Sequence, residues 1–520
     1  MASPFTAAYD KLVDQSLDKW HFPGVAIAVV KDSDTWAKGY GLAQQDPPKP
    51  VEPTTLFYAA STTKAQLCAA WAIYMASEDN QSKPASEQIT WSTPLSRIIR
   101  DDFVLSDPTR TVQVTLEDAV SHRTGLPRHE LSYGYDGVNT PRELTRNLRN
   151  LYLHNELRTT FEYCNTPFVA ASHALETLTG KPLAQVLRES LWQPLGMEHT
   201  YGGYGEASVA VEKTGAVLAK GTIWSKLPTS PDEADGHLIE EAHMDFPEVS
   251  GAGWVISTAD NYAKWMRCWL DPSSGPLSQV MIKELWSPRS IVPPDESYNE
   301  RFDGVLTYGL GWFMSTYKGH MVYWHTGGLI GAGSYVLLCP DIRWGLTFFA
   351  NVQDASFKLK GLAVELLDAA LGVPENERTE RAKVDEEAVE LYKKLAIRTV
   401  EAREQLFPGA PPLPTVPHAL PLEAYTGTFR NVGYGPLTLV VGKDEDGTEC
   451  LRTDLVDRTW KTKMIVSHVN AECWLVSRSM TNSPATSLHR AESKVGVDGK
   501  VQSWGLAMEP AMPDVLTWFA

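Results

Sequence analysis

The spacing of hydrophobic positions changes several times along the chain, and these changes predict its elements. Apolar residues recur on one face of an expected helix over 7–17. A β-branched run over 24–32 ends in a polar turn and is followed by 35–40, which predicts two paired strands. Residues 65–76 are rich in Ala, Leu, Met and Trp and contain neither Gly nor Pro, so we expect a buried helix there.

The middle of the chain has a different pattern. From about residue 85 to 290, short helical patterns alternate with loops rich in Pro, Gly, Ser and Asp. Apolar runs typical of strands return over 308–316, 319–324, 333–339 and 345–350, and a helical stretch over 358–371 follows. Strands at both ends with helices between them predict one sheet interrupted by a largely helical insertion.

A break in composition separates the last part of the chain. Residues 377–407 are highly charged, and Val384, Ala388, Leu391 and Leu395 fall on one face, which predicts an amphipathic helix. The stretch 408–417 is rich in proline and predicts a stiff linker. Beyond Leu422, short apolar runs alternate with turn residues, which is typical of a small antiparallel sheet or barrel. We therefore expect a first domain over 1–375, a helix and linker over 376–421, and a β-barrel domain over 422–520.

Composition narrows the possible partners. The formal net charge of −17 argues against a nucleic acid or an anionic membrane, because both require a basic face. We find no signal peptide at the N-terminus and no apolar run long enough to span a bilayer. The six cysteines are scattered without a C-x-x-C pair and are expected to be reduced. These features predict a cytoplasmic protein and leave its oligomeric state open.

Three short motifs carry candidate chemistry. Ser61 and Lys64 form S-x-x-K, which places both side chains on one face of a helix, where a desolvated lysine activates a serine hydroxyl. Tyr163 and Asn165 form Y-x-N, offering a proton relay and an amide that orients a substrate.

The third motif is the segment His325, Thr326, Gly327 and Gly328. Its glycines allow close approach of a ligand, and the N–H groups of Gly328 and Ser61 are candidates for an oxyanion hole. Trp312, together with Trp254 and Trp324, lies beside motif segments, so we expect it to form an aromatic pocket wall.

With these motifs in this order, the chain resembles the serine β-lactamase and penicillin-binding-protein superfamily, near its class C β-lactamase, DD-peptidase and esterase branch. The resemblance spans about residues 7 to 371, and the last hundred residues resemble the lipocalin-like barrel of some members. It implies an α/β (α+β) fold, a β-lactamase/transpeptidase-like domain with an antiparallel sheet flanked by helices, plus a small C-terminal antiparallel β-barrel.

The resemblance also implies roles for these residues. Ser61 is the expected nucleophile, Lys64 its activator and Tyr163 the proton relay, with either Lys64 or Tyr163 as the base. Asn165, His325, Thr326 and Gly327 are expected to bind substrate. Typical β-lactamases carry lysine where this chain has His325, and a histidine is mostly neutral at pH 7. This departure favours a small-molecule ester, lactone or amide over a β-lactam antibiotic as the substrate.

Several alternatives stay open from the sequence. An acyltransferase, and a peptidase or amidase specific for D-amino acids, would each use the same acyl-enzyme. A binding protein built on a catalytically retired enzyme fold is a further alternative. No metal-ligand spacing or dinucleotide-binding loop is present, so we expect no cofactor. Cys164 lacks an adjacent base and is interpreted as a buried packing thiol.

Overall fold

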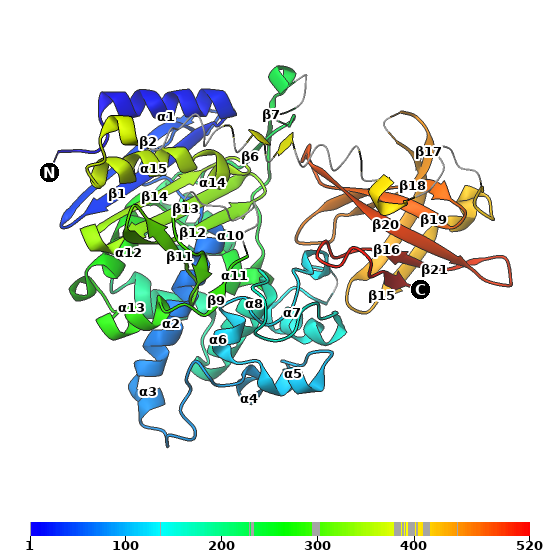
Figure 1. Ribbon diagram of the computed structural model, residues 1–520, viewed down its shortest axis with the longest axis horizontal. Coiled ribbons are helices and arrows are strands. Elements are labelled where there is room, and N and C mark those ends of the chain that lie inside the picture. The colour runs from blue at the N-terminus through cyan, green and yellow to red at the C-terminus, as the bar shows by residue number, and fades with distance from the viewer. Residues whose placement is uncertain are drawn as a thin grey trace.

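The computed structural model contains two bodies of regular structure, and Figure 1 shows them side by side. It describes residues 2–520 apart from 136, 228, 230–232, 294–301, 379–385, 387–388, 391, 394–400, 402–403, 409–415 and 445. The four apolar positions of the amphipathic helix predicted over 377–407, and most of the predicted proline-rich linker, lie outside the described residues.

A nine-stranded antiparallel sheet is the centre of the larger body, with the order β3-β2-β1-β14-β13-β12-β11-β10-β9. Residues from both ends of this body pair directly, since Val25 lies opposite Ala350 and Lys31 opposite Trp344. This confirms a single sheet built from strands on either side of a helical insertion. The strands are β1 (Gly24–Lys31), β2 (Asp34–Gln44), β3 (Lys49–Pro50), β9 (Ser290–Ile291), β10 (Thr307–Tyr308), β11 (Phe313–Tyr317), β12 (His320–Leu329), β13 (Ala332–Cys339) and β14 (Trp344–Ala350).

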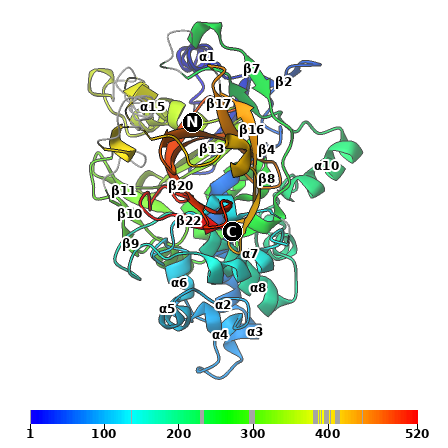
Figure 2. The same ribbon diagram turned by 90° about the vertical axis from the view of Figure 1, so that its right-hand side faces the viewer.

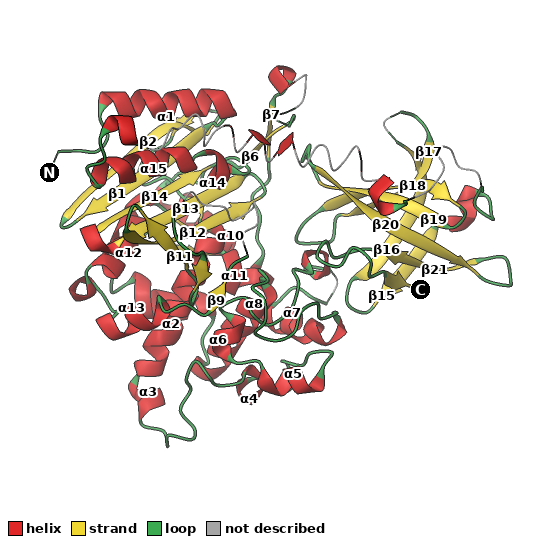
Figure 3. Ribbon diagram, in the orientation of Figure 1, coloured by secondary structure: helices red, strands yellow, loops and turns green. Residues whose placement is uncertain are grey.

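Helices cover both faces of this sheet (Figure 3). On one face, α1 contacts α15 through Tyr9, whose hydroxyl donates a hydrogen bond to the Leu362 carbonyl. The other face packs against α12 and, farther out, the helical region with α2 and α8. The helices are α1 (Ala7–Trp20), α2 (Thr63–Ala76), α3 (Glu78–Gln81), α4 (Leu95–Ile98), α5 (Pro108–Gln113), α6 (Leu116–Ala119), α7 (Pro141–Asn147), α8 (Thr166–Thr179), α9 (Leu183–Leu187), α10 (Gly203–Thr214), α11 (Ser250–Gly253), α12 (Ala259–Leu270), α13 (Gln279–Leu285), α14 (Ala355–Lys358) and α15 (Lys360–Ala370).

Short strands add two small sheets beside the large one. Strands β4 (Phe57–Tyr58) and β5 (Tyr201–Gly202) both pair with β8 (Val255–Ser257), and β6 (Thr222–Trp224) pairs with β7 (Leu238–Glu240). The three-stranded sheet matters for function, because β4 leads directly into the turn that carries Ser61.

The predicted strand over 308–316 is wrong as a single element. The chain reverses there, so that Tyr308 pairs with Phe313 across a tight turn. Gly311 has φ +80°, a conformation that favours glycine, and the Gly309 N–H bonds the Trp312 carbonyl at 2.9 Å. A hairpin between β10 and β11 results.

The smaller body is a nearly closed antiparallel barrel of eight strands in sequential order. Reciprocal backbone hydrogen bonds of 2.9 and 3.0 Å between Arg430 and Ala520 join its first and last strands. Figure 2 views the molecule from the barrel side. The strands are β15 (Gly427–Asn431), β16 (Gly435–Lys443), β17 (Glu449–Leu455), β18 (Thr462–Asn470), β19 (Cys473–Met480), β20 (Thr486–Val495), β21 (Val501–Leu506) and β22 (Thr517–Phe519).

The barrel is joined to the larger body by specific contacts. The Asn147 amide donates to the Gly433 carbonyl at 2.9 Å, and the Tyr135 hydroxyl donates to the Val432 carbonyl at 3.0 Å. A loop before β16 is thereby held against α7. No helix among the described residues combines the length and apolar character needed to cross a bilayer.

Candidate active site

Ser61 lies on a 3₁₀ turn, Ala60–Thr62, that comes directly before α2. The carbonyl of Ala59 anchors this turn, since it accepts hydrogen bonds from the hydroxyls of Thr62 at 2.8 Å and Ser334 at 2.6 Å. Ala60, directly before Ser61, has φ +48°, a backbone conformation that residues other than glycine rarely adopt. The turn therefore presents the Ser61 hydroxyl to a cavity while its backbone stays fixed.

Lys64 is fully buried one helical turn beyond Ser61. Its Nζ lies 3.0 Å from Ser61 Oγ and donates a hydrogen bond of 2.7 Å to the Ala252 carbonyl. Burial lowers the pKa of Lys64 well below its usual value, and the Arg128 cation lowers it further against the opposing effect of Glu130. The site therefore favours a neutral amine beside the serine hydroxyl.

Tyr163 completes the contacts of the Ser61 hydroxyl by donating a hydrogen bond of 2.9 Å to Oγ. The Arg128 guanidinium and the Lys64 amine both face its ring, with Lys64 Nζ at 4.9 Å and Arg128 Cζ at 5.1 Å from the centroid. The buried His122 stacks on the same ring with centroids 4.2 Å apart. The phenol is thus held in one orientation by groups from three separate segments.

Only part of the third motif reaches the cavity. Thr326 and Gly328 line it, as expected for alternate residues of strand β12. Gly327 is buried against the Ser61 turn, where an added Cβ would lie 2.5 Å from the Ala59 carbonyl oxygen. A glycine is therefore required for β12 to approach the turn this closely.

His325 does not line the cavity, which corrects its expected contact with substrate. It is 1% exposed and packs behind Tyr163, with Nε2 3.0 Å from the Tyr308 hydroxyl and Nδ1 2.6 Å from the Thr326 carbonyl. Burial lowers the pKa of His325 to about 3. It is a neutral packing group and offers no cation to a substrate.

Trp312 is also excluded from the cavity, contrary to expectation. It is fully buried and meets Trp269 edge to face at 4.9 Å, because the turn after Gly311 directs it into the core. Trp254 and Trp324 do not line the cavity either. The aromatic wall comes instead from Phe246, Phe357 and Trp460.

Asn165 lines the cavity, where its Oδ1 is buried without a hydrogen-bond partner among the described residues. Its Nδ2 donates to Glu130 at 3.3 Å, and Glu130 in turn forms an ion pair with Arg128 at 2.8 Å. An unsatisfied buried acceptor is costly unless a ligand donates to it. Asn165 therefore places a hydrogen-bond acceptor at the wall of the cavity.

The cavity beside Ser61 has a volume of about 640 Å³ and lies between the two bodies. One wall belongs to the barrel: Trp460, Thr462, Arg478, Met480, Met508 and Glu509. The sequence motifs identified neither this wall nor Arg128 and Glu130. Arg128 and Glu130, like the barrel residues, stand outside the three motifs, so no local pattern marked them.

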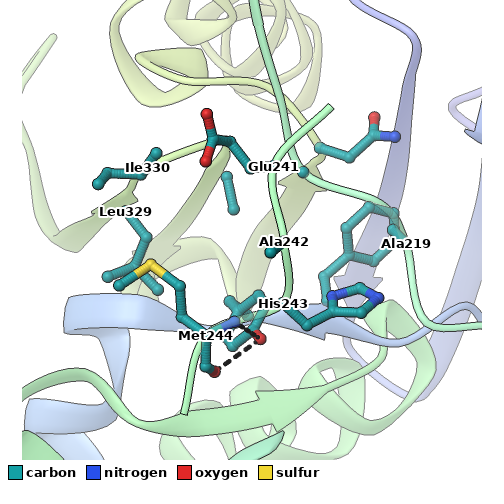
Figure 4. A pocket seen from close by; sticks show the side chains of 12 residues that line it. Ala219, Glu241, Ala242, His243, Met244, Leu329 and Ile330 are labelled. Atoms are coloured by element: carbon teal, nitrogen blue, oxygen red, sulfur yellow. Dashed lines mark hydrogen bonds between the residues drawn. The ribbon is translucent and has the colours of Figure 1, made fainter. Parts of the chain in front are cut away.

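A much smaller hollow of about 10 Å³ lies near one end of the cavity, and Figure 4 shows its lining. Leu329 and Ile330 border both spaces. The backbone of Met244 closes it by exchanging two hydrogen bonds with the Tyr58 hydroxyl, at 2.8 and 2.9 Å. This volume approaches that of a single water, so it extends no binding site.

Cys164 lies next to Tyr163 but is buried, and its thiol donates a hydrogen bond of 3.0 Å to the Pro127 carbonyl. Burial raises the pKa of this thiol to about 12. A thiol held in its protonated form is a poor nucleophile, which agrees with its interpretation as a packing group.

At this site a buried amine and a phenol contact one serine, which lies at a helix N-terminus beside a strand of the sheet. This arrangement defines a serine hydrolase of the β-lactamase and transpeptidase type. The Beta-lactamase family model matches residues 9–371. The chain therefore belongs to the beta-lactamase family. This agrees with the resemblance stated from the three motifs.

The chain is 35% identical over 519 residues to "Unguisins hydrolase ungD'" of Aspergillus campestris, covering 99% of this chain and 92% of the relative. The octameric penicillin-binding protein homologue of Pyrococcus abyssi superimposes with a TM-score of 0.60 at 17% identity, over 99% of both chains. A D-amino acid amidase of Ochrobactrum anthropi has a TM-score of 0.55 at 22% identity, over 72% of this chain and 99% of the amidase. These two structures share the fold.

Proposed function

We propose that this protein hydrolyses an amide bond of a small peptide-like compound through an acyl-enzyme on Ser61. The observation that carries the proposal is the pair of contacts on one hydroxyl, Lys64 Nζ at 3.0 Å and Tyr163 Oη at 2.9 Å. The relationship to an unguisins hydrolase over nearly the whole chain supports unguisins or related compounds as substrates.

The proposed acylation begins with Lys64 as the general base. Its neutral amine takes the Ser61 proton while Oγ bonds to the substrate carbonyl carbon. The negative charge that develops on the carbonyl oxygen is stabilised by the N–H groups of Ser61 and Gly328, both of which line the cavity. Tyr163 passes a proton to the leaving nitrogen as the C–N bond breaks, and Lys64 restores that proton.

Deacylation reverses these roles with water as the nucleophile. The same base takes a proton from the water, which attacks the ester carbon, and the proton returns to Ser61 Oγ as the acid product leaves. An ester or a lactone would react by the same steps with an oxygen leaving group. An alcohol or amine in place of the water would give acyl transfer.

The orientation of Asn165 supports an amide substrate. Its buried Oδ1 accepts a hydrogen bond, which an amide N–H next to the scissile bond supplies and a simple alkyl ester does not. The volume of the cavity, about 640 Å³, lies within the range of sites that bind small molecules of this size.

A covalent probe tests the proposal directly. Native protein is incubated with a fluorophosphonate, and intact mass and peptide mapping locate the adduct. We expect one adduct on Ser61 that is absent in Ser61→Ala. Absence of an adduct on the native protein, or its persistence in the variant, would show a binding protein or another nucleophile.

The substrate class is tested next with unguisins. We expect hydrolysis products whose total mass exceeds that of the substrate by one water, as one opened product or as two fragments, and no such products with Ser61→Ala. Added alcohols or amines that divert the acyl group to a new ester or amide would instead favour the acyltransferase. Turnover confined to D-amino-acid amides would favour the D-specific amidase.

A further inference from the structure

The segment Arg128–Glu130, here named the 128–130 loop, connects the catalytic groups to the barrel. Arg128 stacks on Tyr163 and Glu130 bonds Asn165, so the residues at both ends of the loop contact the site. Between them, His129 points away from the cavity and into the contact between the two bodies. It is 2% exposed.

Two barrel residues bind His129 directly. Its backbone N–H donates to Glu509 at 2.6 Å, and its ring Nδ1 lies 2.6 Å from the Tyr434 hydroxyl. Its Nε2 lies 2.8 Å from the Tyr152 carbonyl, which only accepts, so Nε2 carries the proton. Nδ1 is then the acceptor, and Tyr434 is its donor.

His129 has φ +48°, a conformation that side chains other than glycine adopt only when their surroundings impose it. Burial lowers the pKa of its ring, so the ring is neutral and matches both partners. The unusual backbone conformation is what turns Arg128 and Glu130 together toward the cavity. Two of the contacts that hold it, those of Glu509 and Tyr434, come from the barrel.

We propose that Glu509 and Tyr434 are positioning residues, which hold the 128–130 loop so that Arg128 and Glu130 lie against Tyr163 and Asn165. The barrel is then an integral part of the catalytic centre. This inference rests on the proposed function of Ser61. It assigns a role to the barrel beyond that of a wall of the cavity.

The test uses the full chain with Tyr434→Phe and Glu509→Leu, each of which removes one hydrogen bond to His129. Asn482→Ala is the matched control, because Asn482 bonds Glu241 across the same two bodies at 2.8 Å without contacting the loop. The rate of Ser61 acylation by p-nitrophenyl acetate is measured, because its small acetyl group limits contact with the cavity walls. Circular dichroism melting monitors folding.

We expect both loop variants to lose about tenfold in acylation rate, the effect of one misplaced polar contact, with little change in KM. Asn482→Ala should keep the wild-type rate. Tyr434→Phe carries particular weight, because Tyr434 does not line the cavity and the substitution removes a single oxygen. Wild-type rates in both loop variants, or an equal loss in the control, would overturn the inference.

The pH profile gives a second readout that general destabilisation does not move. The charged or titratable groups that face Lys64 among the described residues include Arg128, Glu130, Tyr163, Cys68, Cys164, His122 and His325. Arg128 lowers the pKa of Lys64 and Glu130 raises it, and the effect of Arg128 is the larger. Release of the loop should therefore raise the pKa of Lys64. The rise of the acylation rate with pH should then occur at higher pH. An unmoved limb would contradict the positioning role.

The proposed function and this inference fail in different ways. If fluorophosphonate does not label Ser61 of the native protein, the proposed function itself is wrong. If it labels native protein and both loop variants at one rate, only the positioning role is wrong.

Discussion

Replacing Lys64 by methionine removes the buried amine while keeping an unbranched side chain of similar length. In the structure this deletes the contact of 3.0 Å with Ser61 Oγ and the hydrogen bond of 2.7 Å to the Ala252 carbonyl. Loss of a positioned general base typically lowers the rate by about 10²–10⁴-fold. That range corresponds to about 2.7–5.4 kcal/mol of activation free energy.

The assay is burst-phase acylation of Ser61 by a p-nitrophenyl ester between pH 5 and 10. In the wild type we expect the rate to rise with pH along a limb that reports deprotonation of Lys64. That limb should lie well below 10.5, because burial and the Arg128 cation lower the pKa of this amine. In Lys64→Met the limb should disappear together with most of the rate.

The matched control is Lys358→Met. Lys358 is also a buried lysine whose pKa is lowered by burial, but its amine faces the rings of Trp20, Phe22 and Tyr392 instead of Ser61. We expect its acylation rate to stay within about twofold of wild type. A Lys64→Met protein that folds and keeps more than a tenth of the wild-type rate would refute the assignment of Lys64 as the base, as would a wild-type limb near pH 10.

Three further outcomes are expected. Tyr163→Phe deletes the hydroxyl 2.9 Å from Ser61 Oγ, so the acylation rate should fall about 10²-fold or more; a rate within threefold of wild type would contradict the relay. Cys164→Ala should leave fluorophosphonate labelling of Ser61 unchanged, because burial raises the pKa of that thiol to about 12; loss of the adduct on mass analysis would point to the thiol instead. The lowered pKa of Lys64 in the folded state means that the unfolded chain binds more protons between that value and about 10.5, so the free energy of unfolding should rise with pH across this window. Urea titrations at several pH values should show a flatter pH dependence in Lys64→Met than in wild type.

Local pattern was sufficient for much of the fold. The β-branched run and its turn predicted β1 and β2, and the stretch free of Gly and Pro predicted α2 (Thr63–Ala76). Each of these signals depends on neighbours a few residues away, where side-chain alternation and backbone propensity act directly. The strand predicted over 308–316 failed because Gly311 reverses the chain through a positive φ, and the apolar spacing around it continues through the reversal.

The candidate site was likewise predicted from local pattern only in part. Ser61 and Lys64 are close because one helical turn separates them, so their spacing in the sequence already implied the contact of 3.0 Å. Tyr163 joined them through the family resemblance, and its contact with Ser61 spans 102 positions in the chain. His325 and Trp312 face the core instead of the cavity. Their orientation depends on what packs against β12 and α12, and the local spacing of residues does not encode that packing.

By itself, the sequence predicted the general architecture and placed Ser61 beside the amine of Lys64, because these follow from residue type and short-range geometry. Only the tertiary structure decided what surrounds them. The wall formed by the barrel and the bonds from Glu509 and Tyr434 to His129 join residues more than 300 positions apart. Such contacts form only when the two bodies pack, so the shape of the cavity and the placement of the 128–130 loop are properties of the folded chain.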